Sequence, residues 1–169
     1  MTDTSFSTRL EQARDLADVF ELVKAAVSRC TGRCRAGLML GMANLGGGLD
    51  GFVGAFYPVA TNIIVVNSLP LARIKETEPR LFKPYAFHIL LHEYVHTLGV
   101  VDEAEARAQV LRISQEMFGE RHPVTDFARD MAKYVPKLVY PVYGWKPDQD
   151  YEIDIVPGFD RSSSAGYIR

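Results

Sequence analysis

Two histidines separated by three residues constrain this chain more than any other feature of its sequence. Residues 91–103 read Leu-His-Glu-Tyr-Val-His-Thr-Leu-Gly-Val-Val-Asp-Glu, which places the pattern H-E-x-x-H between His92 and His96. On an α-helix, side chains four positions apart lie on the same face, roughly 6 Å from each other. Two imidazoles at that spacing can bind one tetrahedral zinc ion at about 2.0–2.1 Å each. We therefore predict a metal-binding helix in this stretch.

The residues around the motif also favour a helix. Pro84 suits a first helical turn, and Gly99 suits the position just after a last turn. Between them, apolar side chains recur every three or four residues, as in a helix with one buried face. These side chains are Phe87, Leu91, Tyr94, Val95 and Leu98. The pattern predicts a helix over residues 84–98.

Glu93 lies next to the two histidines but is rotated off their face of the helix. It is therefore close to the metal and poorly placed to be a ligand. A carboxylate in that position can accept a proton from a zinc-bound water, whose pKa the metal lowers toward about 7. We predict that His92 and His96 bind Zn²⁺ and that Glu93 is the catalytic general base.

The third metal ligand is less clearly indicated. Asp102 lies six residues after His96, and a tight turn at Gly99 would bring it back to the metal, although it also suits a helix N-cap. The competing candidates are Glu103, Glu105, Glu116 and His122. His88 is excluded, because eight helical residues separate it from His96 by about 12 Å. Three protein ligands plus water would make the site catalytic, and four would make it structural.

The composition indicates one globular domain without special partners. The chain has 169 residues, 47% hydrophobic and 24% charged, with a net charge of −2 and no basic tract. We therefore expect no nucleic-acid binding. No apolar run reaches the length of a membrane span, and Met1-Thr-Asp-Thr-Ser is unlike a secretory signal. With Cys30 and Cys34 read as free thiols, we expect a cytoplasmic protein.

The rest of the chain predicts an α+β domain, with a small antiparallel or mixed sheet packed on helices. Helices are expected over residues 8–30, 102–118 and 123–135, in addition to the motif helix. Strands are expected over residues 35–43, 52–57 and 61–67, joined as an antiparallel meander, and residues 68–78 are expected to be loop with a short helix.

Residues 136–169 form a C-terminal extension rich in proline and aromatic residues. We expect this extension to pack on the single domain, because its apolar side chains are costly to leave in water. Those side chains are Tyr151, Ile153, Ile155, Phe159, Tyr167 and Ile168. A tail packed over the metal would keep the site latent.

The block H-E-Y-V-H-T-L-G-V-V-D resembles the zincin metallopeptidases, in the metzincin form H-E-x-x-H-x-x-G-x-x-[HD]. The resemblance implies that His92, His96 and Asp102 bind zinc, that Glu93 is the base, and that a peptide or protein substrate lies antiparallel to an edge strand. Residues 52–57 or 61–67 would supply that strand. Met131 would be the methionine beneath the metal, although it lies in a predicted helix.

Two other resemblances qualify this interpretation. An acidic helix directly after the motif is more similar to the gluzincins, which favours Glu103, Glu105 or Glu116. The block also resembles uncharacterised archaeal-type proteins with the core H-E-Y-x-H-x-L-G-x-x-D-E, for which no activity follows.

We also considered two other functions. The spacing H-x-x-x-H-x-L-G-x-x-[HD] resembles a family of zinc-dependent rRNA-processing endoribonucleases, but Glu93 and the negative net charge oppose RNA cleavage. A non-catalytic zinc protein is the other alternative. For a peptidase, the candidate oxyanion donors are His122, Tyr134, Tyr140 and Tyr143. The oligomeric state and the identity of the substrate are not predicted.

Overall fold

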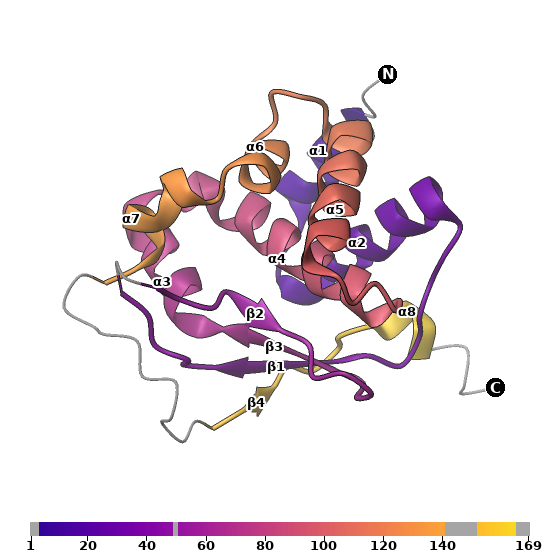
Figure 1. Cartoon of the computed structure of the whole chain (residues 1–169), viewed down its shortest axis with the longest axis horizontal. Helices are drawn as coiled ribbons and strands as arrows, with labels where there is room; N and C mark the ends of the chain where they lie inside the picture. The colour runs from indigo at the N-terminus through magenta and orange to yellow at the C-terminus, as the bar shows by residue number, and fades with distance from the viewer. Residues whose placement is uncertain (1–3, 49–50, 141–151, 165–169) are drawn as a thin grey trace.

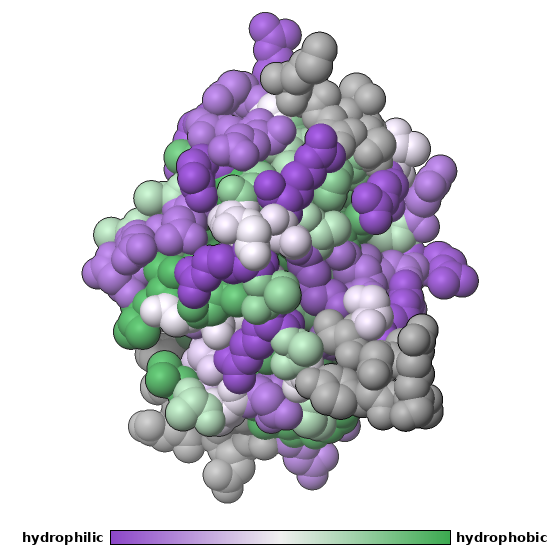
Figure 2. Space-filling model, turned by 90° about the vertical axis from the view of Figure 1, so that its right-hand side faces the viewer, coloured by the Kyte–Doolittle hydropathy of each residue, from purple (hydrophilic) through white to green (hydrophobic). Residues whose placement is uncertain are grey.

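The protein is an α+β domain in which helices pack on one face of a small sheet (Figure 1). The computed structural model describes residues 4–48, 51–140 and 152–164. Within these residues, no helix combines the length and the apolar character needed to cross a membrane. On the face shown in Figure 2, hydrophilic side chains predominate and hydrophobic ones form smaller groups between them.

The helices are α1 (Thr4–Gln12), α2 (Leu16–Thr31), α3 (Ser68–Thr77), α4 (Phe82–Thr97), α5 (Glu103–Phe118), α6 (Pro123–Arg129), α7 (Val135–Leu138) and α8 (Arg161–Ser164). Short 3-10 helices, Pro79–Leu81 and Ala132–Tyr134, precede α4 and α7. The strands are β1 (Met39–Ala43), β2 (Ala55–Phe56), β3 (Ile63–Asn67) and β4 (Asp154–Ile155).

The sheet is mixed, with the strand order β2-β3-β1-β4. β1 and β3 are parallel, with Leu40 opposite Ile64, whereas β2 runs antiparallel to β3 and β4 antiparallel to β1. The predicted antiparallel meander is therefore wrong. The segment between β1 and β3 is long enough to return the chain to the same end of the sheet, and β3 then forms a buried parallel pair with β1.

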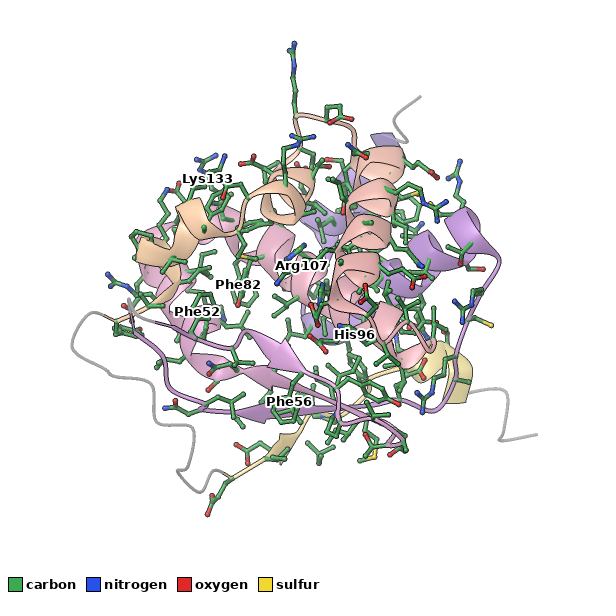
Figure 3. The ribbon with its side chains drawn as sticks, in the orientation of Figure 1. Phe52, Phe56, Phe82, His96, Arg107 and Lys133 are labelled. Atoms are coloured by element: carbon green, nitrogen blue, oxygen red, sulfur yellow. The ribbon has the colours of Figure 1, made fainter. Side chains whose placement is uncertain are left out.

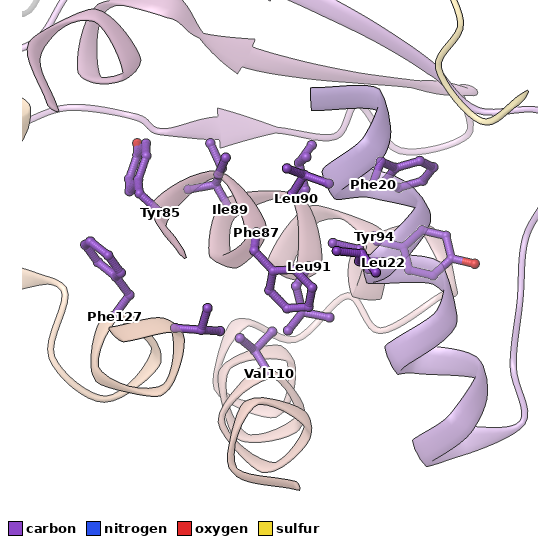
Figure 4. Packing of buried hydrophobic residues seen from close by; sticks show 14 of the residues in the cluster. Phe20, Leu22, Tyr85, Phe87, Ile89, Leu90, Leu91, Tyr94, Val110 and Phe127 are labelled. Atoms are coloured by element: carbon purple, nitrogen blue, oxygen red, sulfur yellow. The ribbon is translucent and has the colours of Figure 1, made fainter. Parts of the chain in front are cut away.

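Helix α4 is the centre of the hydrophobic core. It packs against α2, α5, α6 and the sheet, and its apolar side chains are buried on all sides rather than along one stripe (Figure 4). A helix that is apolar all round must lie inside the protein. The fully buried side chains of α4 include Tyr85, Phe87, Leu90, Leu91 and Tyr94.

The N-terminal region forms two helices where one was predicted over residues 8–30. The helical conformation is interrupted at residues 13–15. Asp15 caps α2 by accepting a hydrogen bond from the backbone N–H of Asp18 at 2.8 Å. Thr8, the first residue of the predicted helix, lies inside α1. The competing cap at Asp15 satisfies the first turn of α2, so the two helices can pack against each other.

Two other boundaries differ from the prediction. Residues 68–77 form the helix α3, because the side chain of Asn67 caps it by accepting from the N–H of Leu69. The helix expected over residues 123–135 ends at Arg129, and Met131 lies between α6 and the next 3-10 helix.

Residues 152–164 return to the body of the domain, with β4 at the edge of the sheet opposite β2 and α8 beside α2 (Figure 1). Phe159 is 8% exposed and stacks on Phe20 of α2, with ring centroids 4.0 Å apart. Ile153 and Ile155, expected to be buried, remain 41% and 51% exposed. Ile155 belongs to β4, a two-residue strand at the edge of the sheet, and Ile153 directly precedes this strand. Tyr151, Tyr167 and Ile168 lie outside the described residues.

The carboxylate of Asp160 attaches this C-terminal segment to the core. Asp160 is fully buried and accepts hydrogen bonds from the N–H of Leu38 at 2.9 Å and from Lys24 Nζ at 2.5 Å. The side chain of Lys24 is itself only 11% exposed. Removing one member of a buried ion pair is costly. Without Asp160, Lys24 would keep its ion pair with Glu21 Oε2 at 2.5 Å, and the N–H of Leu38 would lose its side-chain acceptor.

Asp160→Ala is expected to lower the free energy of unfolding by about 3 kcal/mol, since Lys24 and the N–H of Leu38 lose this acceptor. Urea unfolding followed by circular dichroism would measure the change. Asp154→Ala, at an exposed position of β4, is the matched control and should change stability by less than about 0.5 kcal/mol. Equal effects of the two variants would contradict the role given to Asp160.

Candidate metal centre

The end of α4 and the start of α5 bring two imidazoles and one carboxylate together. His96 Nε2 lies 3.1 Å from His92 Nε2 and 2.8 Å from Glu103 Oε1, and His92 Nε2 lies 3.3 Å from Glu103 Oε2. One ligand atom from each residue lies within 4.8 Å of the others. Figure 3 shows His96 on the helical side of the sheet, above the strand that carries Phe56.

This geometry fits a zinc ion. Ligand atoms about 2.0 Å from a tetrahedral zinc are separated from one another by roughly 3.3 Å. The observed separations of 2.8–3.3 Å are close to that value. The Nδ1–H of His96 donates to the carbonyl oxygen of Val100 at 2.6 Å, which leaves the Nε2 lone pair free for a metal. Two neutral imidazoles and one carboxylate are a donor set typical of catalytic zinc.

The structure does not bring Asp102, the first choice from the sequence, to the imidazoles. Its side chain caps α5 and accepts from the N–H of Glu105 at 2.8 Å. The turn at Gly99, which has a φ of 98°, does form as predicted. It places Asp102 at the cap of α5, so the next residue, Glu103, projects from the first turn toward α4. Glu103 was one of the alternatives named from the sequence.

The remaining candidate ligands lie outside this group. Glu105 accepts a hydrogen bond from Gln109 on the surface of α5. Glu116 lies beside Cys30, where burial and this carboxylate raise the pKa of the thiol to about 11. The ring of His122 caps α6 and contacts Ser7 Oγ at 3.2 Å.

Glu93 is buried beside the three ligands and is 7% exposed. Burial raises the pKa of its carboxyl to about 7, and the proximity of His96 and a hydrogen bond from the backbone N–H of Tyr57 partly offset this rise. Burial also lowers the pKa of His92, whose imidazole is therefore neutral and available to a metal. The site thus combines the neutral imidazole of His92 with a buried carboxyl group whose pKa is about 7.

Two cavities open on either side of the group. The smaller, about 310 Å³, is lined by His96 and Tyr57, and the larger, about 720 Å³, by His92 and Arg107. Both are lined by Glu93, Glu103 and Ala55. Of the two segments predicted to offer an edge strand, β3 is an interior strand and β2 is the terminal strand of the sheet. The cleft therefore extends along β2 in both directions from the candidate metal position.

The predicted oxyanion donors are engaged elsewhere. The hydroxyl of Tyr134 donates to Asp126, and that of Tyr140 donates to Glu76 at 2.8 Å. Tyr143 lies outside the described residues. Met131 lines the larger cavity.

Arg107, which the sequence analysis did not single out, lies one turn after Glu103. Its Nε is 3.7 Å from Glu103 Oε2, and its side chain lines the larger cavity (Figure 3). The four-residue spacing places Glu103 and Arg107 on one face of α5. This spacing is the feature of the sequence from which the position of Arg107 could have been predicted.

Comparisons of the chain with models of protein families, with curated proteins and with solved structures found no match. The chemistry of the site is therefore inferred from the geometry of its own residues.

Glu103 and Asp102 are adjacent carboxylates with different roles, so their amide variants form a matched pair. Glu103→Gln is expected to weaken zinc binding by more than about 100-fold, beyond the effect of losing an outer-shell partner. Asp102→Asn should bind zinc normally and stay equally stable, because asparagine caps helices as well as aspartate does. Competition with a fluorescent zinc chelator would measure both affinities, and zinc loss in Asp102→Asn alone would reverse the assignment.

Proposed function

We propose that this chain is a zinc-dependent peptidase in which His92, His96 and Glu103 hold the metal. Glu93 acts as the general base in this proposal. The main support is that ligand atoms from two imidazoles and one carboxylate lie within 4.8 Å of one another at the cleft. The buried carboxyl group of Glu93 lies beside them. Three protein ligands leave a zinc coordination position for water, as catalytic sites require.

A zinc ion held by His92, His96 and Glu103 would supply a Lewis acid for the reaction. Glu93, buried at the cleft, has a pKa of about 7 and is suited to take a proton from a water molecule and to pass it to the leaving amine nitrogen. Both cavities reach Glu93, so a substrate crossing the site must pass this carboxylate.

The form of the cleft favours an extended polypeptide as the substrate. β2 is the terminal strand of the sheet, and Ala55 borders both cavities. An extended peptide can add to such an edge through backbone hydrogen bonds while its side chains enter the flanking pockets. The substrate would then run antiparallel to β2 and place one peptide bond at the metal.

This assignment is a variant of the zincin arrangement that the motif resembles. The proposed third ligand, Glu103, lies seven residues after His96, one position beyond the metzincin-like aspartate. It lies on the acidic helix that follows the motif, as in the gluzincin-like interpretation, but much closer in sequence than Glu116.

The alternatives have less support from the described residues. The endoribonuclease-like spacing requires a ligand at position 102, where Asp102 is used as a helix cap. The net charge of −2 also disfavours binding to a phosphate backbone. A latent site covered by the tail is not supported by residues 152–164, because none of them lines either cavity.

Glu93→Gln is expected to retain stoichiometric zinc and to lose at least about 100-fold of the cleavage rate on casein, because only the proton acceptor is removed. Atomic absorption and a fluorescent casein assay would measure the two properties. Glu105→Gln changes an acid outside the metal group and should keep full activity. Wild-type cleavage by Glu93→Gln would contradict the mechanism, and cleavage of RNA but not casein would contradict the substrate class.

A further inference from the structure

Two residues that line the larger cavity each carry a buried polar atom without a hydrogen-bond partner among the described residues. Tyr85 and His88, on the part of α4 that precedes the metal-binding turn, line this cavity. Tyr85 is 0% exposed, and its hydroxyl has no hydrogen-bond partner among the described residues. His88 is partly buried as a residue, but its Nδ1 atom is enclosed and also has no described partner. Buried polar atoms are nearly always paired, so two unpaired ones in one cavity point to a ligand.

The walls around these two atoms are apolar and largely aromatic. The ring of Phe127 lies 5.7 Å from that of Tyr85 and 6.3 Å from that of His88, between centroids. Phe52 and Val110 also line the cavity. In Figure 4, Tyr85 and Phe127 lie at the same end of α4, with the phenol oxygen directed toward the sheet. Such walls favour a flat ring in the occupant.

Gly54 lies beside the phenol oxygen of Tyr85. A Cβ atom at this position would lie 3.0 Å from Tyr85 Oη and 3.5 Å from Ile89 Cγ2. Gly54 lines the same cavity, immediately before β2. A side chain at position 54 would therefore crowd the hydroxyl of Tyr85.

The electrostatics of the cavity exclude a charged ligand group beside Tyr85 and His88. Burial lowers the pKa of His88 to about 3, so its imidazole is neutral at physiological pH. The cations that line the cavity are paired, Arg107 with Glu103 and Arg129 with Glu120. A carboxylate or ammonium near Tyr85 and His88 would thus be desolvated without a counter-ion. The group that fits is neutral and both donates and accepts hydrogen bonds.

We propose that the larger cavity binds a tyrosine side chain of the substrate, whose hydroxyl donates to His88 Nδ1 and accepts from the hydroxyl of Tyr85. The ring of the bound tyrosine lies between the aromatic walls. As a substrate preference, this inference rests on the proposed peptidase function, but binding of the phenol itself does not require the metal. The cavity distinguishes tyrosine from phenylalanine because only the phenol satisfies both buried atoms.

The test compares p-cresol with toluene, which differ only in the hydroxyl group. In the 169-residue chain as purified, titration followed by NMR is expected to show p-cresol binding about 30-fold more tightly, the effect of roughly two hydrogen bonds. Tyr85→Phe should reduce this ratio about fivefold, because the hydrogen bond to His88 remains. Equal affinities in the wild type, or an unchanged ratio in Tyr85→Phe, would overturn the proposal, as would tighter binding of propionamide than of p-cresol.

Tyr94→Phe is the matched control on the same helix. Tyr94 is equally buried, but its hydroxyl accepts a hydrogen bond from the N–H of Arg35 at 2.9 Å. This variant should lower the unfolding midpoint by about 3 °C and leave the cresol-to-toluene ratio unchanged. Tyr85→Phe should not lower the midpoint, because its hydroxyl has no described partner to lose.

Gly54→Ala, which fills the space beside Tyr85, should weaken p-cresol binding at least 10-fold.

Peptide cleavage separates this inference from the proposed function. Two peptides that differ only by tyrosine or phenylalanine beside the scissile bond are incubated with the zinc-loaded chain. Faster cleavage of the tyrosine peptide, lost in Tyr85→Phe, supports both proposals. A cresol preference without cleavage of any peptide supports the pocket and contradicts the peptidase. Equal cleavage of both peptides with equal binding of cresol and toluene overturns the pocket alone.

Discussion

The complete burial of α4 is the constraint on which the rest of the structure depends. Apolar side chains project from all faces of this helix and are buried against α2, α5, α6 and the sheet. The helix therefore has one fixed position and rotation in the domain. Its histidines and Glu93 consequently face the cleft beside β2. A rigid, fully packed element is the kind of scaffold on which a metal-binding pair can be held within a fraction of an ångström.

The second element of the site is fixed by backbone hydrogen bonding rather than by packing. The cap formed by Asp102 starts α5 immediately after the turn at Gly99, and this start determines where the Glu103 carboxylate points. The same turn presents the carbonyl of Val100 to His96 Nδ1. One short loop thus supplies the third candidate ligand, the orientation of the second, and a helix whose first turn favours negative charge.

Local features of the site could be predicted from the sequence, and non-local ones could not. The motif helix and the turn at Gly99 depend on residues within a few positions of each other, and both formed as expected. The cap formed by Asp102 could not be distinguished from a metal ligand in the sequence, because one carboxylate suits either role and only the position of α5 relative to α4 decides between them. The parallel pairing of β1 with β3 likewise depends on contacts across more than twenty residues, which spacing alone does not encode.

Helix α4 also shows how stability and function are divided along a single element. Tyr94 and Tyr85 are both fully buried, yet only the hydroxyl of Tyr94 is satisfied by the fold itself, through the N–H of Arg35. A phenylalanine at position 85 would fill the same volume without an unpaired oxygen, so packing does not explain the hydroxyl there. An unpaired buried hydroxyl lowers the stability of the unbound protein. Its presence is explained if a bound group completes the hydrogen bond. By this reasoning the unpaired atoms of α4 would take part in the proposed cleft chemistry together with His92 and His96, at a different part of a bound peptide.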